Sequence, residues 1–479
     1  MLFERFDAKG IAQHSYAVGC HKVGKLLIVD PCRDVDHYLN FAKENKMQIS
    51  HILETHIPAD YVSGAKDLAM KTGAELCLSA YDSGETFEVS FPHTQIYEGD
   101  KLEIGQIVLE AVHTPGISPE HISYLVYDCL RSKELPALML TGDFLLVGSV
   151  GRTDVNRDDD KRSAAEKLFH SLREKLKSLP DSLEIYPSHS GGSLCAKGIS
   201  KKPSSTLGYE RAVNPYLDES LTEREFVDKI LRSFSPLPQY YQRMKLQNSE
   251  GAPALHALPG LKAIDVERFH WLVNSGHIVI DIRDESAFAA GHIPGSFGIG
   301  ASSVVGNWAG WVLPYETSIL LVTEDPDKVR DAVRSLVRVG FDQIEGYLNG
   351  GIEAWEQGEY EIKALPWINP EELNKSPQNK VLDVRGAEEW ETGHIKGSLN
   401  FPGGQIGEHL DDLGDRKLEI TVVCGGGYRA TVAASVLQRE GFTNVSLLSG
   451  GMKGWKKLGL PIDTEVSAVV GSSQEVVRT

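Results

Sequence analysis

The sequence predicts an α/β protein with three domains, and three observations lead to this prediction. The length of 479 residues is enough for about three domains of ordinary size. Residues 1–250 alternate short apolar strands with helical segments. Residues 263–466 carry one pattern twice, at an offset of 102 residues, which indicates two copies of a domain of about 100 residues.

Composition limits the classes of function. The net charge of −18 argues against nucleic acid or an anionic membrane as a partner. No run of 18 apolar residues occurs, so no membrane span is expected, and Met1–Asp7 lacks the pattern of a secretory signal. The six cysteines are scattered and include no C-x-x-C pair, which favours a reducing, cytoplasmic location.

The N-terminal 250 residues are predicted to hold a site at one edge of a sheet. The expected strands are Lys25–Asp30, Ile52–Thr55, Glu75–Leu78, Ile107–Val112, Leu138–Asp143 and Leu183–Pro187. Polar residues gather just after strand ends, at Thr55–His56, Thr114–Gly116, Gly142–Asp143 and Ser188–His189. Strand ends converge on one sheet edge, which is the usual position of an α/β active site.

The linker and the tail are predicted from composition. Residues 251–262 contain two prolines and two glycines and are expected to connect the first domain to the repeats. Residues 467–479 are short, polar and expected to be flexible.

The repeat is visible in two pairs of segments. Val279–Arg283 and Gly291–Ser296 match Val381–Arg385 and Gly393–Ser398. Further on, a Gly-Gly pair is followed by a tryptophan in both copies, ending at Trp355 in the first and at Trp455 in the second. The domain boundaries that follow are 263–362 and 363–466.

The most informative residue is Cys424. It follows the apolar segment Ile420–Val423, which is predicted to be a buried strand, and precedes a predicted helix over 430–437. The residues between are Gly425, Gly426, Gly427, Tyr428 and Arg429. Consecutive glycines let a loop turn its backbone N–H groups inward, and a helix N-terminus with a nearby arginine favours a thiolate. The sequence therefore predicts a reactive cysteine.

The repeats resemble rhodanese domains, through D-x-R, G-H-I-x-G-S and G-G-x-x-x-W together. The resemblance implies that Cys424 is the sulfur-accepting nucleophile, that Arg429 assists it, and that residues 425–428 cradle a persulfide. Related phosphatases have one more residue between Cys and Arg, so this spacing favours sulfur transfer. In the first copy Thr323 stands at the cysteine position, and Glu324, Asp325 and Asp327 make its loop acidic. That copy is predicted to be inactive.

Residues 1–250 resemble the persulfide dioxygenase branch of the metallo-β-lactamase fold. The matching segments are Glu54–Asp60, His113–Gly116, Thr141–Asp143, Gly151–Asp154 and Tyr186–His189. The resemblance implies an αββα sandwich, and the whole order of domains is similar to bacterial fusions of a persulfide dioxygenase with a silent and an active rhodanese. It also implies a homodimer formed through the N-terminal domain.

The family's iron site is not reproduced in the sequence. Carried over by motif, the iron triad would be His56, Ile117 and Asp143, and Pro58 stands where the family has another histidine. Isoleucine has no donor atom, and two ligands do not hold Fe(II) tightly. Loss of iron binding is therefore expected.

Three arrangements of the remaining polar residues stay open. The residues that survive from the family's metal site are His56, Asp60, Asp143 and His189. They could hold another metal, or His113 or His121 could replace the missing ligand. In the preferred interpretation the histidines hydrogen-bond the aspartates in a metal-free cleft. Cys195, six residues after His189, is expected to be a buried, unreactive thiol.

Two arginines match positions near the family's substrate cleft. Arg152 and Arg211 could hold a carboxylate of glutathione or a similar small thiol, or could form surface ion pairs.

The sequence thus favours a sulfurtransferase that takes sulfur from thiosulfate or a small persulfide and needs no cofactor. The alternatives are an iron-dependent persulfide dioxygenase coupled to a rhodanese, and a non-catalytic protein that binds or senses thiols or persulfides.

Overall fold

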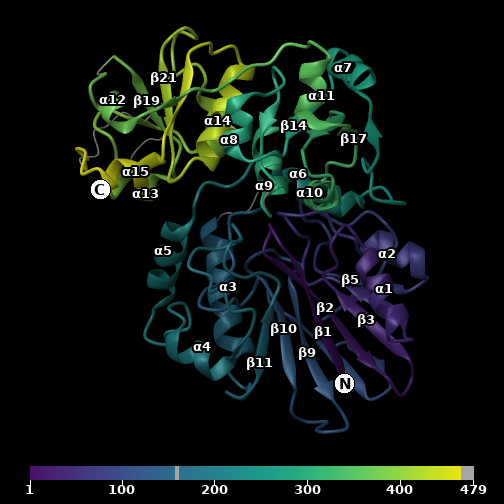
Figure 1. The fold of residues 1–479 in the computed structure, drawn as a ribbon. Helices are drawn as coiled ribbons and strands as arrows, with labels where there is room; N and C mark the ends of the chain where they lie inside the picture. The colour runs from purple at the N-terminus through teal and green to yellow at the C-terminus, as the bar shows by residue number, and fades with distance from the viewer. Residues whose placement is uncertain (157–160, 302, 377, 465–479) are drawn as a thin grey trace. The chain divides into compact units, whose positions relative to one another are not determined.

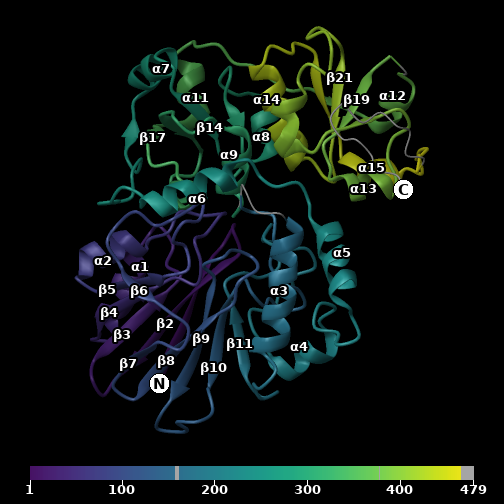
Figure 2. The ribbon, with the colours of Figure 1, turned by 180° about the vertical axis from the view of Figure 1, so that it is seen from behind.

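The structure, a computed structural model, describes residues 1–156, 161–301, 303–376 and 378–464 (Figures 1 and 2). It forms two compact units. The first contains Met1–Ala257 and Val337–Gly340, and the second contains Leu258–Leu336 and the described residues from Phe341 onward. The predicted tail, 467–479, lies outside the described residues. Within the described segments, no helix has both the length and the apolar character needed to cross a membrane.

The first unit contains two six-stranded sheets. The first sheet runs in chain order: β1 (Leu2–Ala8), β2 (Gln13–Cys20), β3 (Lys25–Val29), β4 (Gln48–Leu53), β5 (Glu75–Ser79) and β6 (Thr94–Ile96). The second has the order β12 (Ser205–Thr206), β11 (Glu184–Pro187), β10 (Leu138–Gly142), β9 (Ile122–Asp128), β8 (Ile107–His113) and β7 (Lys101–Ile104). Strands β3 to β6 are parallel, as are β10 and β11, and the other neighbours are antiparallel.

Three apolar clusters show how these sheets and the helices are layered. One cluster lies between the sheets and contains Leu27 and Leu53 from one and Leu109 and Leu140 from the other. A second packs α1 (Asp36–Glu44) and α2 (Ala65–Thr72) on the first sheet. The third packs α3 (Lys161–Lys175), α4 (Leu207–Val213) and α5 (Glu223–Ser233) on the second sheet. The expected αββα sandwich is confirmed, with α3 to α5 on the outer face of the second sheet (Figure 1).

Helix α6 (Tyr240–Glu250) fastens a loop that leads into the site. The side-chain amide of Asn248 donates to the carbonyls of Pro58 and Tyr61, both at 2.8 Å. The loop after β4, which carries His56 and Asp60, is therefore held by the helix that closes the first unit.

The second unit contains two five-stranded parallel sheets of identical topology. In the first the order is β13 (Ala263–Ile264), β17 (Ile344–Leu348), β16 (Ile319–Val322), β14 (Ile278–Asp281) and β15 (Phe297–Gly298). In the second it is β18 (Trp367–Ile368), β22 (Val445–Leu448), β21 (Ile420–Val423), β19 (Lys380–Asp383) and β20 (Leu399–Asn400). The buried central strand β16 is a continuous apolar run, and β21 is apolar except for Thr421, as is typical of parallel sheets covered on both faces.

Helices join these strands in the same order in both copies. The first copy contains α7 (Val266–Asn274), α8 (Glu285–Ala290), α9 (Val305–Val312), α10 (Asp327–Arg338) and α11 (Gly351–Gln357). The second contains α12 (Pro370–Asn374), α13 (Ala387–Glu391), the 3₁₀ helix η1 (Gly403–His409), α14 (Tyr428–Arg439) and α15 (Gly451–Lys457).

The repeated sequence motifs make repeated contacts. Arg283 and Arg385 each form a two-pronged ion pair with the aspartate two residues earlier, with Nη2–Oδ2 distances of 2.6 Å in both copies. Trp355 and Trp455 each donate from the indole nitrogen to a carbonyl six residues later, at 2.9 Å. The two copies are thus equivalent in their framework, and they differ at the loop after the central strand.

Candidate active site and metal-ligand cluster

Cys424 lies directly after β21, at the start of the loop that leads into α14. Its side chain is 2 % exposed. Its carbonyl accepts a hydrogen bond of 2.8 Å from the N–H of Met452 in α15. Gly451 comes so close to this carbonyl that a side chain there would clash, which explains the small residue. The loop is therefore held firmly against α15.

Gly427 contacts the sulfur of Cys424 through its backbone. Its N–H donates to Sγ of Cys424 at 3.0 Å. This requires a φ of 141°, a value that favours glycine. The sulfur also lies at the N-terminus of a 12-residue helix, where the helix dipole favours a negative charge. Gly426 is exposed and has no atom near the position of its missing side chain, so the loop has open space on that side.

Arg429 pairs with a carboxylate of the neighbouring helix α13. Its guanidinium forms a two-pronged ion pair with Glu389 of α13, with N–O distances of 2.5 and 2.9 Å. The same contact lowers the pKa of Glu389 below its usual value. Both side chains are partly exposed, at 31 % and 47 %. The sequence predicts that Arg429 assists an anionic reactant at Cys424. Such a reactant must therefore compete with Glu389 for the guanidinium.

The first copy borders the loop on one side. The hydroxyl of Tyr428 donates to the carbonyl of Gly300 at 3.4 Å, and its ring meets the ring of Trp308 edge to face, with centroids 6.2 Å apart. Gly300 and Trp308 belong to the first rhodanese-like copy. That copy therefore forms part of the surroundings of Cys424.

The equivalent loop of the first copy is closed on itself. The hydroxyl of Thr323 is buried and exchanges hydrogen bonds of 3.0 and 3.1 Å with the backbone of Asp325. Glu324 contacts Arg283 at 3.4 Å. The side chains of Glu324, Asp325 and Asp327 are exposed. This loop has no thiol and presents negative charge to an approaching anion.

In the first unit, His189 lies between two carboxylates. Its Nδ1 is 2.6 Å from Oδ1 of Asp143, and its Nε2 is 2.9 Å from Oδ2 of Asp60. Burial alone would lower the pKa of His189, but the carboxylates of Asp143 and Asp60 outweigh it and hold that pKa well above its usual value. Burial likewise opposes ionisation of Asp143, yet His189 lowers the pKa of that carboxyl.

His56 and His121 lie on the other side of Asp143. Nε2 of His56 is 3.8 Å from Oδ2 of Asp143, which is beyond hydrogen-bond distance. The His121 ring stacks on His56 with centroids 5.2 Å apart. Nε2 of His121 accepts the N–H of Asp143 at 3.2 Å, and its Nδ1 is 2.8 Å from the Thr114 hydroxyl. Both nitrogens of His121 are thus engaged.

The residues present do not form the three-ligand iron site that the resemblance implies. Ile117 is 3 % exposed and belongs to the apolar cluster under α3. Nε2 of His113, the other replacement considered, is 2.8 Å from the carbonyl of Pro119, and its ring stacks on Tyr81. Only His56 and Asp143 of the implied triad have donor atoms.

Cys195 joins the cluster, which the sequence did not predict. Its Sγ lies 3.9 Å from Nε2 of His189, and it is 6 % exposed. Burial and the charge of Asp60 raise the pKa of this thiol to about 12. Ligand atoms of Asp60, His189 and Cys195 all lie within 4.8 Å of one another.

Arg152 and Arg211 are both engaged in structural contacts. Arg152 is 3 % exposed, pairs with Asp154 at 2.6 and 2.9 Å, and donates to the carbonyl of Leu194 at 3.2 Å. It therefore holds the loop that carries Cys195. Arg211 pairs with Asp181 and lines a surface cavity. This cavity is not lined by His56, Asp60, Asp143 or His189. Arg211 thus forms the ion pair of the surface alternative, whereas the ion pair of Arg152 is buried.

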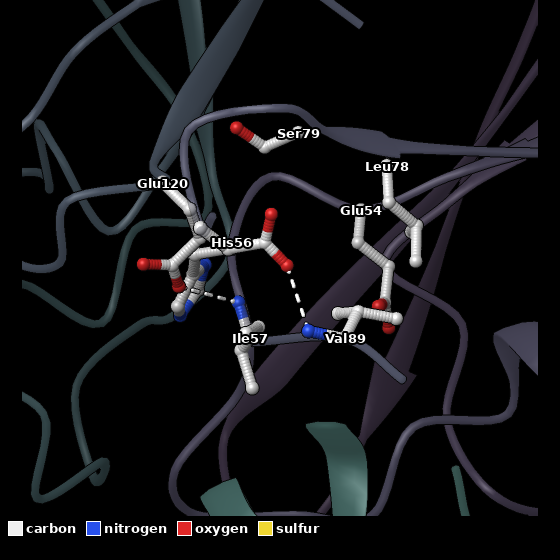
Figure 3. A pocket seen from close by; sticks show the side chains of 8 residues that line it. Glu54, His56, Ile57, Leu78, Ser79, Val89 and Glu120 are labelled. Carbon is white, nitrogen blue, oxygen red and sulfur yellow. Dashed lines mark hydrogen bonds between the residues drawn. The ribbon is translucent and has the colours of Figure 1, made fainter. Parts of the chain in front are cut away.

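A small pocket lies beside His56 (Figure 3). Its volume is about 10 Å³, near the lower limit for one water molecule. Glu120 accepts the N–H of Ile57 at 3.0 Å on one side, and Glu54 lies near Leu78 and Val89 on the other (Figure 3). Burial raises the pKa of Glu54 to about 8, with a smaller contribution from the charges of Asp30 and Glu120.

Comparison with known proteins agrees with this architecture. The rhodanese-like domain model matches residues 265–358 and 369–458, and the metallo-beta-lactamase superfamily model matches residues 9–189. A crystal structure of a metallo-beta-lactamase from Staphylococcus aureus subsp. aureus COL is 34 % identical with a TM-score of 0.66, and the match covers 72 % of this chain and 98 % of that one. The chain belongs to the metallo-β-lactamase superfamily and carries two rhodanese-like domains. The family resemblance inferred from the motifs is confirmed.

Two curated relatives match the metallo-β-lactamase part of the chain. The persulfide dioxygenase ETHE1 of Mus musculus is 27 % identical over 241 residues, which is 50 % of this chain and 84 % of that protein. A hydroxyacylglutathione hydrolase of Polaromonas sp. is 29 % identical over 191 residues, which is 40 % of this chain and 66 % of that protein.

Proposed function

We propose that this protein is a sulfurtransferase of sulfane-sulfur metabolism that acts through a persulfide on Cys424. Contact between Sγ of Cys424 and the N–H of Gly427, at a helix N-terminus, is the observation that carries the proposal. A hydrogen bond to an anion stabilises that anion. This one would stabilise the Cys424 thiolate before the reaction and the terminal sulfur of the persulfide after it.

The reaction has two balanced steps. The Cys424 thiolate attacks the outer sulfur of thiosulfate, an S–S bond forms, and sulfite leaves with the electron pair of the broken S–S bond. An acceptor thiolate or cyanide then attacks the terminal sulfur, and Cys424 leaves as a thiolate. No external oxidant or cofactor is needed. The open position at Gly426 suits a small donor or acceptor.

The N-terminal domain is proposed to have lost iron binding and, with it, dioxygenase activity. The support is the donor count, since Ile117 and Pro58 offer no ligand atoms and Ile117 is packed in the apolar core. The names of the relatives, persulfide dioxygenase and hydroxyacylglutathione hydrolase, favour a small thiol or its persulfide as the molecule that this protein handles. The first rhodanese-like copy is proposed to be inactive and to border the active loop.

Steady-state thiosulfate:cyanide transfer by the full chain tests the proposal. Cys424→Ser should abolish thiocyanate formation, because the hydroxyl cannot form a persulfide. Cys129→Ser, at a partly exposed cysteine of the first unit, is the matched control and should keep the wild-type rate. Transfer that survives Cys424→Ser would show that another group carries the sulfur.

A further inference from the structure

The first rhodanese-like copy places a carboxylate against the loop of Cys424. Glu285 is the first residue of α8 and is partly exposed. A side-chain carbon at Gly427 would lie 3.6 Å from Cγ and 3.6 Å from Oε1 of Glu285. The carboxylate therefore borders the residue whose N–H donates to the sulfur of Cys424. The two steps of sulfur transfer described above do not use it.

An indole ring borders the same side of the loop. Cη2 of Trp367, in β18, would also lie 3.6 Å from a side-chain carbon at Gly427. Trp367 is 39 % exposed, so part of its ring faces solvent. Because Gly427 carries no side chain, room is left beside the carboxylate of Glu285 and the ring of Trp367. This side of the loop therefore presents a negative charge next to an apolar surface.

The other side of the loop presents the opposite charge. A side-chain carbon at Gly425 would lie 3.3 Å from Nη2 of Arg429. Gly426, between the two sides, is exposed and has open space around the position of its missing side chain. The loop thus runs from a guanidinium beside Gly425 to a carboxylate beside Gly427. An anionic sulfur donor suits the first side, and a cationic group suits the second.

The fold of α8 does not depend on the carboxylate of Glu285. The preceding residue, Asp284, is the N-cap of α8, and its side chain accepts the N–H groups of Ser286 and Ala287. The second copy has Ala387 at the corresponding position, at the offset of 102 residues, and forms the equivalent helix α13 there. The negative charge at this position therefore belongs to the first copy alone and is not required by the shared framework.

We propose that Glu285 selects sulfur acceptors that carry an ammonium group near the thiol. The proposal rests on the proposed sulfur transfer through Cys424. The ammonium group of such an aminothiol pairs with the carboxylate of Glu285, and its methylene groups lie against the ring of Trp367. The acceptor thiolate attacks the terminal sulfur of the Cys424 persulfide, a new S–S bond forms, and Cys424 leaves with the electron pair of the broken bond. The first copy, which has no thiol of its own, thereby supplies a specificity-determining residue.

Two thiols that differ in one group test the proposal on the full chain. Cysteamine and 2-mercaptoethanol have the same length, and cysteamine carries an ammonium group where 2-mercaptoethanol has a hydroxyl. With thiosulfate as donor, sulfite release gives kcat/KM for each thiol, after subtraction of the rate with Cys424→Ser. Glu285→Gln should lower the ratio of cysteamine to 2-mercaptoethanol by about 1.5- to 5-fold, the range of a partly exposed ion pair. A change in the reactivity of Cys424 itself affects both thiols and cancels from this ratio.

Two further variants control for charge. Glu267→Gln, at an exposed glutamate in the first turn of α7 in the same copy, removes the same charge and should leave the ratio unchanged. Glu285→Lys reverses the charge, so it should lower the ratio further than Glu285→Gln does. It should also raise kcat/KM for 3-mercaptopropionate, which carries a carboxylate in place of the ammonium group.

An unchanged ratio in Glu285→Gln, or an equal change in Glu267→Gln, would overturn the proposal. So would an equal loss with both thiols, because that result would assign Glu285 to the thiol and not to the ammonium group. Transfer to cyanide, measured on the same samples, separates this proposal from the proposed sulfur transfer. A wild type that transfers no sulfur to cyanide would refute the transfer itself, whereas cyanide transfer with an unchanged thiol ratio would refute only the role of Glu285.

Discussion

Replacing Glu389 by glutamine should make the protein a better enzyme at low thiosulfate concentration. Glu389 holds Arg429 through two N–O contacts of 2.5 and 2.9 Å, so an anionic donor at Cys424 must compete with it for the guanidinium. Glutamine keeps the shape of the side chain but removes the charge, which frees Arg429 to face the donor.

The size of the effect follows from the exposure of the pair. Arg429 and Glu389 are 31 % and 47 % exposed, and partly exposed ion pairs contribute about 0.2–1 kcal/mol. Because the donor must break this ion pair on binding, removal of the pair should lower KM for thiosulfate by about 1.5- to 5-fold. The free energy of unfolding should change by less than about 0.5 kcal/mol, because the pair is on the surface.

The assay is thiosulfate:cyanide transfer over a range of thiosulfate concentrations. Glu391→Gln, at an exposed residue of the same helix, changes the net charge equally and should leave KM unchanged. In an Arg429→Ala background, which should lower kcat/KM by about 10²- to 10³-fold, Glu389→Gln should have no further effect. An unchanged or higher KM in Glu389→Gln, or an equal change in Glu391→Gln, would refute this view of Arg429.

Three further predictions concern the first copy and the first unit. Thr323→Cys should not gain transfer activity, because Glu324 and Asp325 keep the loop acidic, and activity above that of Cys424→Ser in the double variant would contradict this. Burial raises the pKa of Glu54 from 4.5 to about 8. Between these pH values the folded state therefore keeps a proton that the unfolded state has lost. Stability should therefore fall by about 1.4 kcal/mol per pH unit as the pH rises through this range, and urea unfolding of Glu54→Gln should show a smaller fall than the wild type. Ile117→Ala should lower the free energy of unfolding by about 2–5 kcal/mol, because Ile117 packs in the core, and should leave sulfur transfer unchanged.

Local sequence was enough to predict the strand–loop–helix geometry around Cys424, because strand, glycine turn and helix follow one another within a few residues. Cys424 lies where the pattern places it, and the predicted helix over 430–437 is the middle of α14. The layered fold of the first unit was also predicted, through motifs that sit at strand ends. The repeat could be found from sequence alone because the same motif residues recur in both copies. Arg283 and Arg385, for example, form the same ion pair with the aspartate two residues earlier.

Contacts between residues far apart in the chain could not be predicted in this way. Glu389 is 40 residues from Arg429, and nothing in the spacing shows that the two pair. Cys195 is buried, as expected, but it follows a strand of one sheet and Asp60 follows a strand of the other, so the spacing does not show that both lie beside His189. The sequence could not decide between a substrate contact and an ion pair for Arg152, because its burial and its contact with Asp154 are properties of the folded chain.

Passage of sulfur through Cys424 can be observed by intact-protein mass spectrometry after brief exposure to thiosulfate. The wild-type chain should gain the mass of one sulfur atom, peptide analysis should place that sulfur on Cys424, and cyanide should remove it with formation of thiocyanate. The Cys424→Ser chain should gain no sulfur. Sulfur found on another cysteine, or an adduct that persists in Cys424→Ser, would contradict the account.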